Sequence, residues 1–142
     1  MNEKHPQQIV IKTTINRSVE DVWKSWTKPE HIMKWNQASE DWHTTKADND
    51  LRVGGQFLSR MEAKDGSAGF DFAGIYDEVD PYKTIAYTLE DNRKVNILFN
   101  GNNNQTEVVE TFDAESEYSL EMQKEGWQSI LDQFKNYTEE KF

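Results

Sequence analysis

The sequence predicts an α+β fold, in which a curved antiparallel sheet of about six to seven strands wraps around a long C-terminal helix. Two observations predict it. Apolar residues recur with helical spacing over 116–142, and they recur with a period of two over most of 42–112. A length of 142 residues suits one domain with one core, so residues 1–142 are expected to form a single domain.

Residues 116–142 are predicted to form one long helix with a broad apolar face. The side chains that share this face are Leu120, Trp127, Ile130, Leu131 and Phe134. Polar side chains such as Glu121 and Asp132 fill the opposite face. A helix of this kind needs a large apolar surface to lie on, which the strands would supply. Gly126 is expected to lie where helix and sheet come close.

A first strand and a pair of short helices precede the rest of the sheet. Residues 9–15 alternate apolar and polar side chains, which predicts a strand with one apolar face. Ser18, followed three residues later by Asp21, predicts the start of a short helix. A second short helix is expected to be capped by Thr27, with Pro29 in its first turn.

From residue 42 onward, alternating patterns separated by turn residues predict strands joined by tight turns, which are therefore antiparallel. The expected strands are 42–47, 57–62, 70–76, 84–89, 95–99 and 106–112. The expected turns are 48–50, 65–67, 80–81, 91–92 and 100–104. Four glycines fall where a strongly bent sheet would need residues without side chains, namely Gly54, Gly55, Gly69 and Gly74.

The composition excludes several classes of protein. The net charge of −10 repels phosphate backbones and anionic membrane surfaces, so neither nucleic acid nor a membrane is an expected partner. The absence of cysteine excludes disulfides, zinc–thiolate sites and cysteine nucleophiles. Residues 1–8 are polar, and no apolar run approaches the roughly 20 residues of a membrane span. A cytoplasmic location is expected.

The titratable side chains show no metal-binding or catalytic signature. His5, His31 and His43 lack the spacing of a metal site, and His31 is expected on the solvent side of the second helix. Asp48 and Asp50 suggest a calcium loop, but the later glycine and the bidentate glutamate are missing, which favours a plain turn. No metal, no cofactor and no catalytic residue is therefore predicted.

Several short motifs follow one another along nearly the whole chain. They are Val22-Trp23, Trp26-Thr27-Lys28-Pro29-Glu30, Trp35, Asp50-Leu51-Arg52-Val53-Gly54-Gly55, Phe57, Gly74-Ile75-Tyr76-Asp77-Glu78-Val79-Asp80-Pro81, Thr106, Thr111-Phe112-Asp113, Gly126-Trp127 and Leu131. In this order they resemble the helix-grip fold of the START-like (SRPBCC) superfamily. They are most similar to the branch related to the C-terminal domain of the activator of the ninety-kilodalton heat-shock protein ATPase.

This resemblance implies a deep cavity between the long helix and the curved sheet. Members of the superfamily hold apolar or amphipathic molecules there, such as lipids, sterols, plant hormones and aromatic polyketides. Some relatives are cyclases or other enzymes, and the activator branch implies a chaperone as a partner. The motifs are specific for the fold and the branch and do not specify an activity.

Aromatic side chains on the predicted inward faces are the main candidates for lining such a cavity. The candidate ligand-binding residues are Trp35, Trp42, Arg52, Phe57, Phe70, Phe72, Tyr76, Tyr87, Phe99, Trp127 and Phe134. Arg52 could pair with a ligand carboxylate or phosphate at the cavity mouth, or with an acidic neighbour. The aromatics could equally fill a solid core. The buried hydroxyls of Tyr76 and Tyr87, which need partners, favour a cavity.

The favoured function is non-enzymatic binding, sensing or carrying of a small apolar or aromatic ligand, by a monomer or a weak homodimer. One alternative is an interaction module that acts on a chaperone. The other is a cyclase-type enzyme, for which His43, Glu78 and Glu110 are the candidate acid–base groups. Glu78 is expected to face inward because it shares strand parity with Tyr76.

Overall fold

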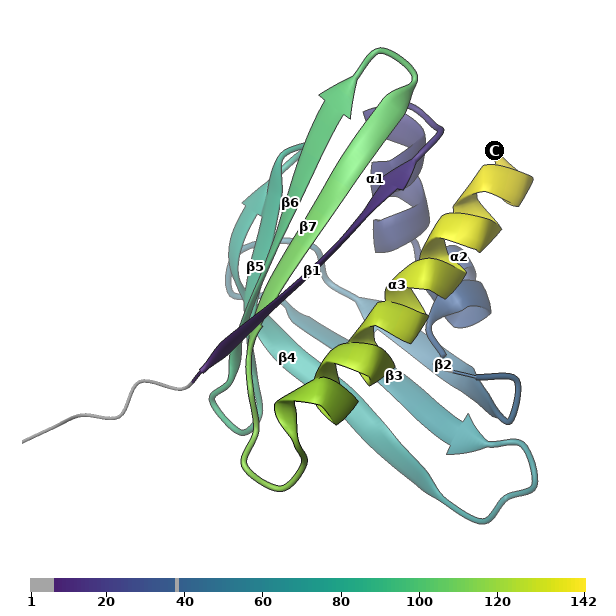
Figure 1. Cartoon of the computed structure of the whole chain (residues 1–142), viewed down its shortest axis with the longest axis vertical. Helices are drawn as coiled ribbons and strands as arrows, with labels where there is room; N and C mark the ends of the chain where they lie inside the picture. Colours follow the sequence, from purple (N-terminus) through teal and green to yellow (C-terminus); the bar gives the residue numbers. More distant parts are fainter. Residues whose placement is uncertain (1–6, 38) are drawn as a thin grey trace, which may run out of the picture.

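The computed structural model describes residues 7–37 and 39–142. Its elements are β1 (Gln8–Ile15), α1 (Val19–Thr27), α2 (Pro29–Trp35), β2 (Trp42–Asn49), β3 (Gln56–Ala63), β4 (Gly69–Asp80), β5 (Thr84–Leu89), β6 (Lys94–Asn102), β7 (Gln105–Asp113) and α3 (Leu120–Lys141). The seven strands form one antiparallel sheet in the order β1-β7-β6-β5-β4-β3-β2. Figure 1 shows the sheet curving around α3, with α1 and α2 on the same side. The predicted helix-grip architecture is confirmed.

The apolar side chains of the sheet gather on the concave face that the helices cover. β3 shows the pattern clearly, because Phe57, Ser59, Met61 and Ala63 are buried while the residues between them are partly exposed. Successive side chains of a strand point to opposite faces, so this alternation places every second residue against the helices. The predicted period of two therefore identified the inward residues of this strand.

The sheet bends sharply at β4. A Cβ atom on Gly74 would come within 2.7 Å of the carbonyl oxygen of Thr88 and 2.8 Å of the Phe57 ring, so a glycine is needed there. Strand pairing then shifts between Tyr76 and Glu78, which marks a β-bulge. The bulge reverses the alternation and leaves Glu78 exposed. The prediction that Glu78 faces inward is wrong for this reason.

The predicted turns at 48–50 and 100–104 fall partly inside strands. The turn expected at 48–50 is wrong, because β2 continues to Asn49. The turn expected over 100–104 is confirmed only at its end, because β6 continues to Asn102, which pairs with Gln105. Only two residues then connect β6 and β7, and the first has a left-handed φ of 60°, a conformation that asparagine tolerates. Strand pairing therefore extends through residues that local propensity assigns to turns.

The starts of the two short helices differ in how they are capped. Ser18 caps α1 as predicted, because its Oγ accepts a hydrogen bond from the backbone N–H of Asp21 at 3.3 Å. The predicted cap of α2 is wrong. Lys28 occupies the cap position without a side-chain hydrogen bond. Thr27 still belongs to α1, where its hydroxyl donates to the carbonyl oxygen of Trp23 at 2.8 Å.

The long helix α3 is shorter at its start than predicted. Its cap is Ser119, whose Oγ accepts a backbone N–H of the first turn at 3.1 Å. Leu120 is 44% exposed, so the first turn does not pack on the sheet, whereas Leu131 and Phe134 are fully buried. A Cβ atom on Gly126 would meet no atom within 4 Å. The prediction that helix and sheet come close at Gly126 is therefore wrong.

Buried polar contacts join the three helices. The hydroxyls of Ser25 and Thr138 are hydrogen-bonded at 2.8 Å, and Trp35 donates from Nε1 to the carbonyl oxygen of Ser25 at 2.8 Å. His31 Nδ1 is hydrogen-bonded to the hydroxyl of Tyr137 at 2.6 Å. His31 is only 9% exposed, so the prediction that it faces solvent is wrong. The packing of α2 against α3 explains this burial.

Candidate functional site

A pocket of about 260 Å³ lies between the concave face of the sheet and the helices. Seven of the predicted ligand-binding residues line it, namely Trp35, Phe57, Phe70, Phe72, Tyr76, Tyr87 and Trp127. They come from α2, β3, β4, β5 and α3, so both layers of the fold contribute to the walls. The sequence pattern therefore identified most of the aromatic residues that the fold brings together here.

The sheet side of the pocket is an aromatic cluster centred on Phe57. Its ring centroid lies 4.6 Å from that of Tyr87, 5.4 Å from that of Tyr76 and 5.8 Å from that of Phe72. The rings are tilted or edge-on to Phe57, which is the preferred geometry for aromatic pairs. These contacts pack the four rings against one another, and all four line the pocket.

The helix side of the pocket is held in place by Trp127 of α3. Its ring stacks on Phe112 of β7 with a centroid distance of 3.9 Å and an interplanar angle of 10°. The same ring lies 6.0 Å from Phe72, edge to face. Trp127 therefore contacts two strands of the sheet and forms part of the pocket wall.

Two tyrosine hydroxyls lie in the pocket, and they differ in their partners. The Tyr76 hydroxyl donates to Asn49 Oδ1 at 2.5 Å, and Asn49 Nδ2 donates to the carbonyl oxygen of Thr27 at 2.7 Å. The polar group of Tyr76 is thus satisfied by the protein. Burial raises the pKa of Tyr87 well above its usual range, with a smaller contribution from Glu110. No hydrogen bond contributes to this pKa.

A buried carboxyl group, Glu110 of β7, also lines the pocket. It is 5% exposed, and burial raises its pKa from an ordinary value of 4.5 to about 8. The carboxyl is therefore mostly protonated and uncharged at neutral pH. Of the three candidate acid–base groups, only Glu110 lies in the pocket. Glu78 is exposed, and His43 is partly exposed and not part of the pocket wall.

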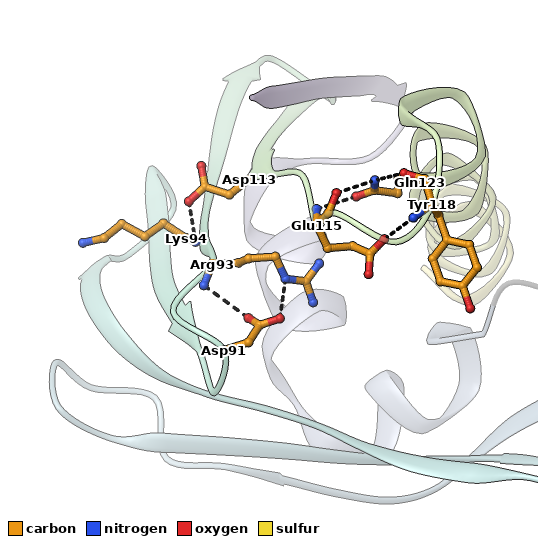
Figure 2. A network of polar contacts seen from close by, with 7 residues as sticks. All are labelled: Asp91, Arg93, Lys94, Asp113, Glu115, Tyr118 and Gln123. Atoms are coloured by element: carbon orange, nitrogen blue, oxygen red, sulfur yellow. Dashed lines mark hydrogen bonds and ion pairs between the residues drawn. The ribbon is translucent and has the colours of Figure 1, made fainter. Parts of the chain in front are cut away.

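At the mouth of the pocket, Arg93 borders a second, shallower pocket beneath the start of α3. Arg93 Nε donates to Asp91 Oδ2 at 2.7 Å (Figure 2). Figure 2 also shows the segment before α3 held by Gln123, which accepts from the backbone N–H of Glu115 at 2.8 Å. Gly126 lines the shallower pocket, which explains the open space around it.

Two predicted residues on β2 and the loop that follows it lie outside the pocket. The Arg52 side chain is 73% exposed, and its Nε pairs with Asp50 Oδ2 at 2.9 Å. Of the two positions considered for Arg52, the structure therefore shows the ion pair with an acidic neighbour and not a place at the cavity mouth. Trp42 is partly buried and packs on Phe70, with ring centroids 5.8 Å apart.

Two other predicted residues fill the solid part of the core. Phe99 packs edge-on against Trp23 at 5.3 Å and Trp26 at 5.9 Å. Phe134 packs against Trp26 at 4.8 Å and Trp35 at 4.9 Å. The core is therefore filled where these rings meet between the helices and β6, and the pocket lies toward β3, β4 and β5.

Sequence reasoning did not include several residues of the wall, among them Trp26, Asn49, Ser59, Met61 and Arg93. Ser59 and Met61 share strand parity with Phe57, so the alternation contained a signal for them. Arg93 lies in the turn between β5 and β6 and carried no such signal.

In the part of the chain that the structure describes, no group of three or more His, Cys, Asp or Glu side chains could hold a metal ion. Across residues 7–37 and 39–142, no helix is long and apolar enough to cross a membrane.

A family model and two similar solved structures point to the same protein family. The family model described as Activator of Hsp90 ATPase homolog 1-like protein matches residues 16–139. An AHSA1-like protein from Aeromonas hydrophila is 44% identical, with 95% of this chain and 94% of that chain covered and a TM-score of 0.90. A protein from Cytophaga hutchinsonii is 48% identical, with coverages of 94% and 93% and a TM-score of 0.81.

More distant structures share the fold alone. A protein from Chromobacterium violaceum is 22% identical, with 94% of this chain and 99% of that chain covered and a TM-score of 0.84. None of the curated proteins matches the chain.

Proposed function

Because the chain belongs to the family of Activator of Hsp90 ATPase homolog 1-like proteins, we propose that it binds a small, largely apolar or aromatic ligand in the pocket between α3 and the sheet. The supporting observation is the pocket wall itself, in which Phe57, Phe72 and Trp127 contribute rings from both layers. Pockets for small molecules are lined in this way, with a few polar groups that fix orientation. Apolar burial at roughly 25 cal/mol per Å² would supply most of the affinity.

A thermal-shift screen against fatty acids, sterols, flavonoids and aromatic polyketides tests the proposal. A ligand present at about 100 times its dissociation constant stabilises the folded state by roughly 2.7 kcal/mol. For a domain of this size, that corresponds to a rise of several degrees in melting temperature. The absence of any shift across the whole library would contradict the proposal.

A pocket-filling variant separates binding in the pocket from binding elsewhere. Ser59 is buried in the pocket wall, so Ser59→Phe places a ring in the space that the ligand would occupy. Asn96 is exposed on β6 and lies outside the pocket wall, so Asn96→Phe is the matched control. We expect the ligand-induced shift to disappear in Ser59→Phe and to remain in Asn96→Phe.

A second candidate function, an enzyme of the cyclase type, is favoured by the position of Glu110 in the pocket. A carboxyl with a pKa of about 8 is suited to donating or accepting a proton near neutral pH. Incubation of an identified ligand with the protein, followed by mass spectrometry, distinguishes the two functions. Conversion that is lost in Glu110→Gln would favour the enzyme, and recovery of unchanged ligand would favour the binding protein.

The family description supports a third candidate, an interaction module that acts on a chaperone ATPase. This candidate is tested by measuring the ATP turnover of a purified Hsp90-type chaperone with and without an excess of this protein. Stimulation of turnover would favour the interaction module. Unchanged turnover, together with a ligand-induced thermal shift, would favour the binding protein.

A further inference from the structure

Two polar side chains in the pocket have no hydrogen-bond partner among the described residues. Glu110 is 5% exposed and Tyr87 is 6% exposed, and both line the pocket wall. Burial alone shifts the pKa of Glu110, with no contribution from a hydrogen bond or a neighbouring charge. Because both side chains line an open pocket, their polar groups are available to pair with a molecule that enters it.

The strand register places these two side chains on the same face of the sheet. Tyr87 pairs with Val95 of β6, and Val95 pairs with Phe112 of β7. Glu110 lies two residues before Phe112 on the same strand, so its side chain points to the same face. One strand separates β5 from β7, which is about 10 Å across the sheet, and Glu110 is offset from the level of Tyr87 by two residues, or about 7 Å along the strand. Both side chains line the same pocket.

Both groups are O–H donors at neutral pH. The other titratable residues of the pocket wall are Asp48, Tyr76 and Arg93. Asp48 pairs with Lys46 at 3.4 Å, the Tyr76 hydroxyl donates to an asparagine, and Arg93 pairs with an aspartate at the mouth. The wall residues that α1, α2 and α3 contribute are not titratable. No cation therefore compensates a carboxylate here, and burial keeps the carboxyl uncharged.

We infer that Glu110 and Tyr87 together hold one carbonyl oxygen of an uncharged aromatic ligand. This inference rests on the proposed binding function of the pocket. A carbonyl oxygen has two lone pairs in one plane and can accept one hydrogen bond from each donor. A cationic ligand would instead require the carboxylate, whose formation in this apolar wall is unfavourable. A purely apolar ligand would leave both donors unpaired.

Three probes with one skeleton test this inference. They are 2-acetylnaphthalene, which carries the carbonyl, 2-isopropenylnaphthalene, in which a methylene group replaces the oxygen, and 1-(2-naphthyl)ethylamine, which is a cation at neutral pH. Binding is measured by calorimetry at pH 7. We expect the ketone to bind about tenfold or more tightly than the olefin, because the olefin leaves the donors unpaired. The preference should decrease in Glu110→Ala and in Tyr87→Phe, with olefin binding retained.

The pH dependence separates a hydrogen-bonding role from a merely structural one. Ketone affinity should be constant from about pH 5 to pH 7 and decrease above about pH 8, where Glu110 loses its proton. Glu110→Gln retains an N–H donor that does not titrate. It should therefore retain the preference for the ketone, with an affinity that no longer depends on pH.

The outcomes that overturn the inference are distinct. Equal affinity for ketone and olefin overturns the donor pair and leaves the binding function of the pocket in place. Tighter binding of the amine, increasing with pH, overturns it in favour of a carboxylate that binds a cation. No binding of any probe, together with no response to the ligand library, overturns the inference and the proposed function together.

Discussion

Glu110 is a carboxyl group at a position where ionisation is unfavourable. Burial raises its pKa from 4.5 to about 8, so the folded state keeps a proton that the unfolded chain releases above about pH 4.5. The folded state binds more protons than the unfolded state between these two values, and its stability therefore decreases as pH rises. The contribution of Glu110 is fully present below about pH 4.5 and is lost by the time the pH passes about 8.

We predict that Glu110→Gln removes this pH dependence. The amide is similar in shape and does not ionise, so the variant should gain stability relative to the unchanged protein as pH rises. The difference should increase with pH between about pH 5 and pH 8, by on the order of 1 kcal/mol per pH unit. Urea unfolding at several pH values measures it. A stability difference between the two proteins that stays constant over this pH range would show that Glu110 is ionised in the folded state.

The sequence contains part of the information needed to place such residues. Thr106, Val108, Glu110 and Phe112 occupy every second position of β7, so the inward direction of Glu110 could be predicted once the register of that strand was chosen. The outward direction of Glu78 could not be predicted, because it depends on a bulge that arises where β4 pairs with β5. A bulge is a property of two strands, and alternation within one strand does not report it.

At the scale of elements, the helices are joined by hydrogen bonds that a sequence pattern does not reveal. His31 of α2 and Tyr137 of α3 are 106 positions apart in the chain. Burial lowers the pKa of His31 below its usual value of 6.5, although the nearby Glu30 carboxylate opposes the shift. The folded state therefore favours neutral His31. Its contribution to stability is present above about pH 6.5 and is lost as the pH falls toward the lowered pKa.

We predict that Tyr137→Phe destabilises the protein by about 1 kcal/mol, because it removes the hydrogen bond between α2 and α3. Tyr118→Phe is the matched control, because Tyr118 is 58% exposed in the segment that precedes α3. Denaturant unfolding at pH 7.5 measures both. Equal stability of the two variants would show that the contact between His31 and Tyr137 makes no net contribution.

We also predict that Gln123→Ala loosens the segment that precedes α3. The Gln123 side chain accepts from the N–H of Glu115 and donates to the carbonyl oxygens of Glu115 at 3.1 Å and Tyr118 at 2.9 Å (Figure 2). Without it, amide hydrogen exchange in residues 115–119 should become faster, while exchange in β6 should not change. Unchanged exchange in the segment would show that the cap at Ser119 is sufficient to hold it.

Secondary structure was predictable where hydrophobic periodicity is long, and less so at the ends of elements. The face of α3 that carries Leu131 and Phe134 followed from helical spacing alone. The residue at which the helix starts did not follow from the sequence, because Ser116 and Ser119 are equally suitable caps by residue type. The choice between them depends on where the chain leaves β7 and on the contacts of Gln123.

At the scale of the whole molecule, an excess of negative charge acts against compactness. The net charge is −10, and the ion pairs are mostly on exposed side chains, such as that between Lys46 and Asp48. Exposed pairs contribute about 0–1 kcal/mol each, so they do not offset the general repulsion. Salt screens charges separated by more than about 10 Å at 0.1 M.

We therefore predict that the melting temperature rises by a few degrees when sodium chloride is increased from about 10 mM to about 200 mM, because long-range repulsion is screened. Differential scanning calorimetry at pH 7 measures the change, with an equal osmolarity of sucrose as the control. A decrease in melting temperature would show that the surface ion pairs contribute more than the repulsion.

The antiparallel topology could be predicted, because strands joined by tight turns pair with their neighbours in sequence. The position of the pocket could not, since large aromatic residues line a cavity and fill a core equally well. Phe57 and Phe99 have the same alternating context, but only Phe57 lies in the pocket wall. Trp23 and Trp26 of α1 fill the space above Phe99, and this packing is decided in three dimensions.

The sheet order also determines when the fold can be completed during synthesis. Strands β2 to β7 are hairpin neighbours and can pair one after another as they leave the ribosome. β1 pairs only with β7, whose residues Gln105–Asp113 are made nearly last. At about 5–20 residues per second, β1 waits on the order of 5 to 20 seconds for its partner. During that time the isoleucines of β1 lack the strand beside which they are buried in the folded protein, so the sheet cannot be completed before Asp113 has been made.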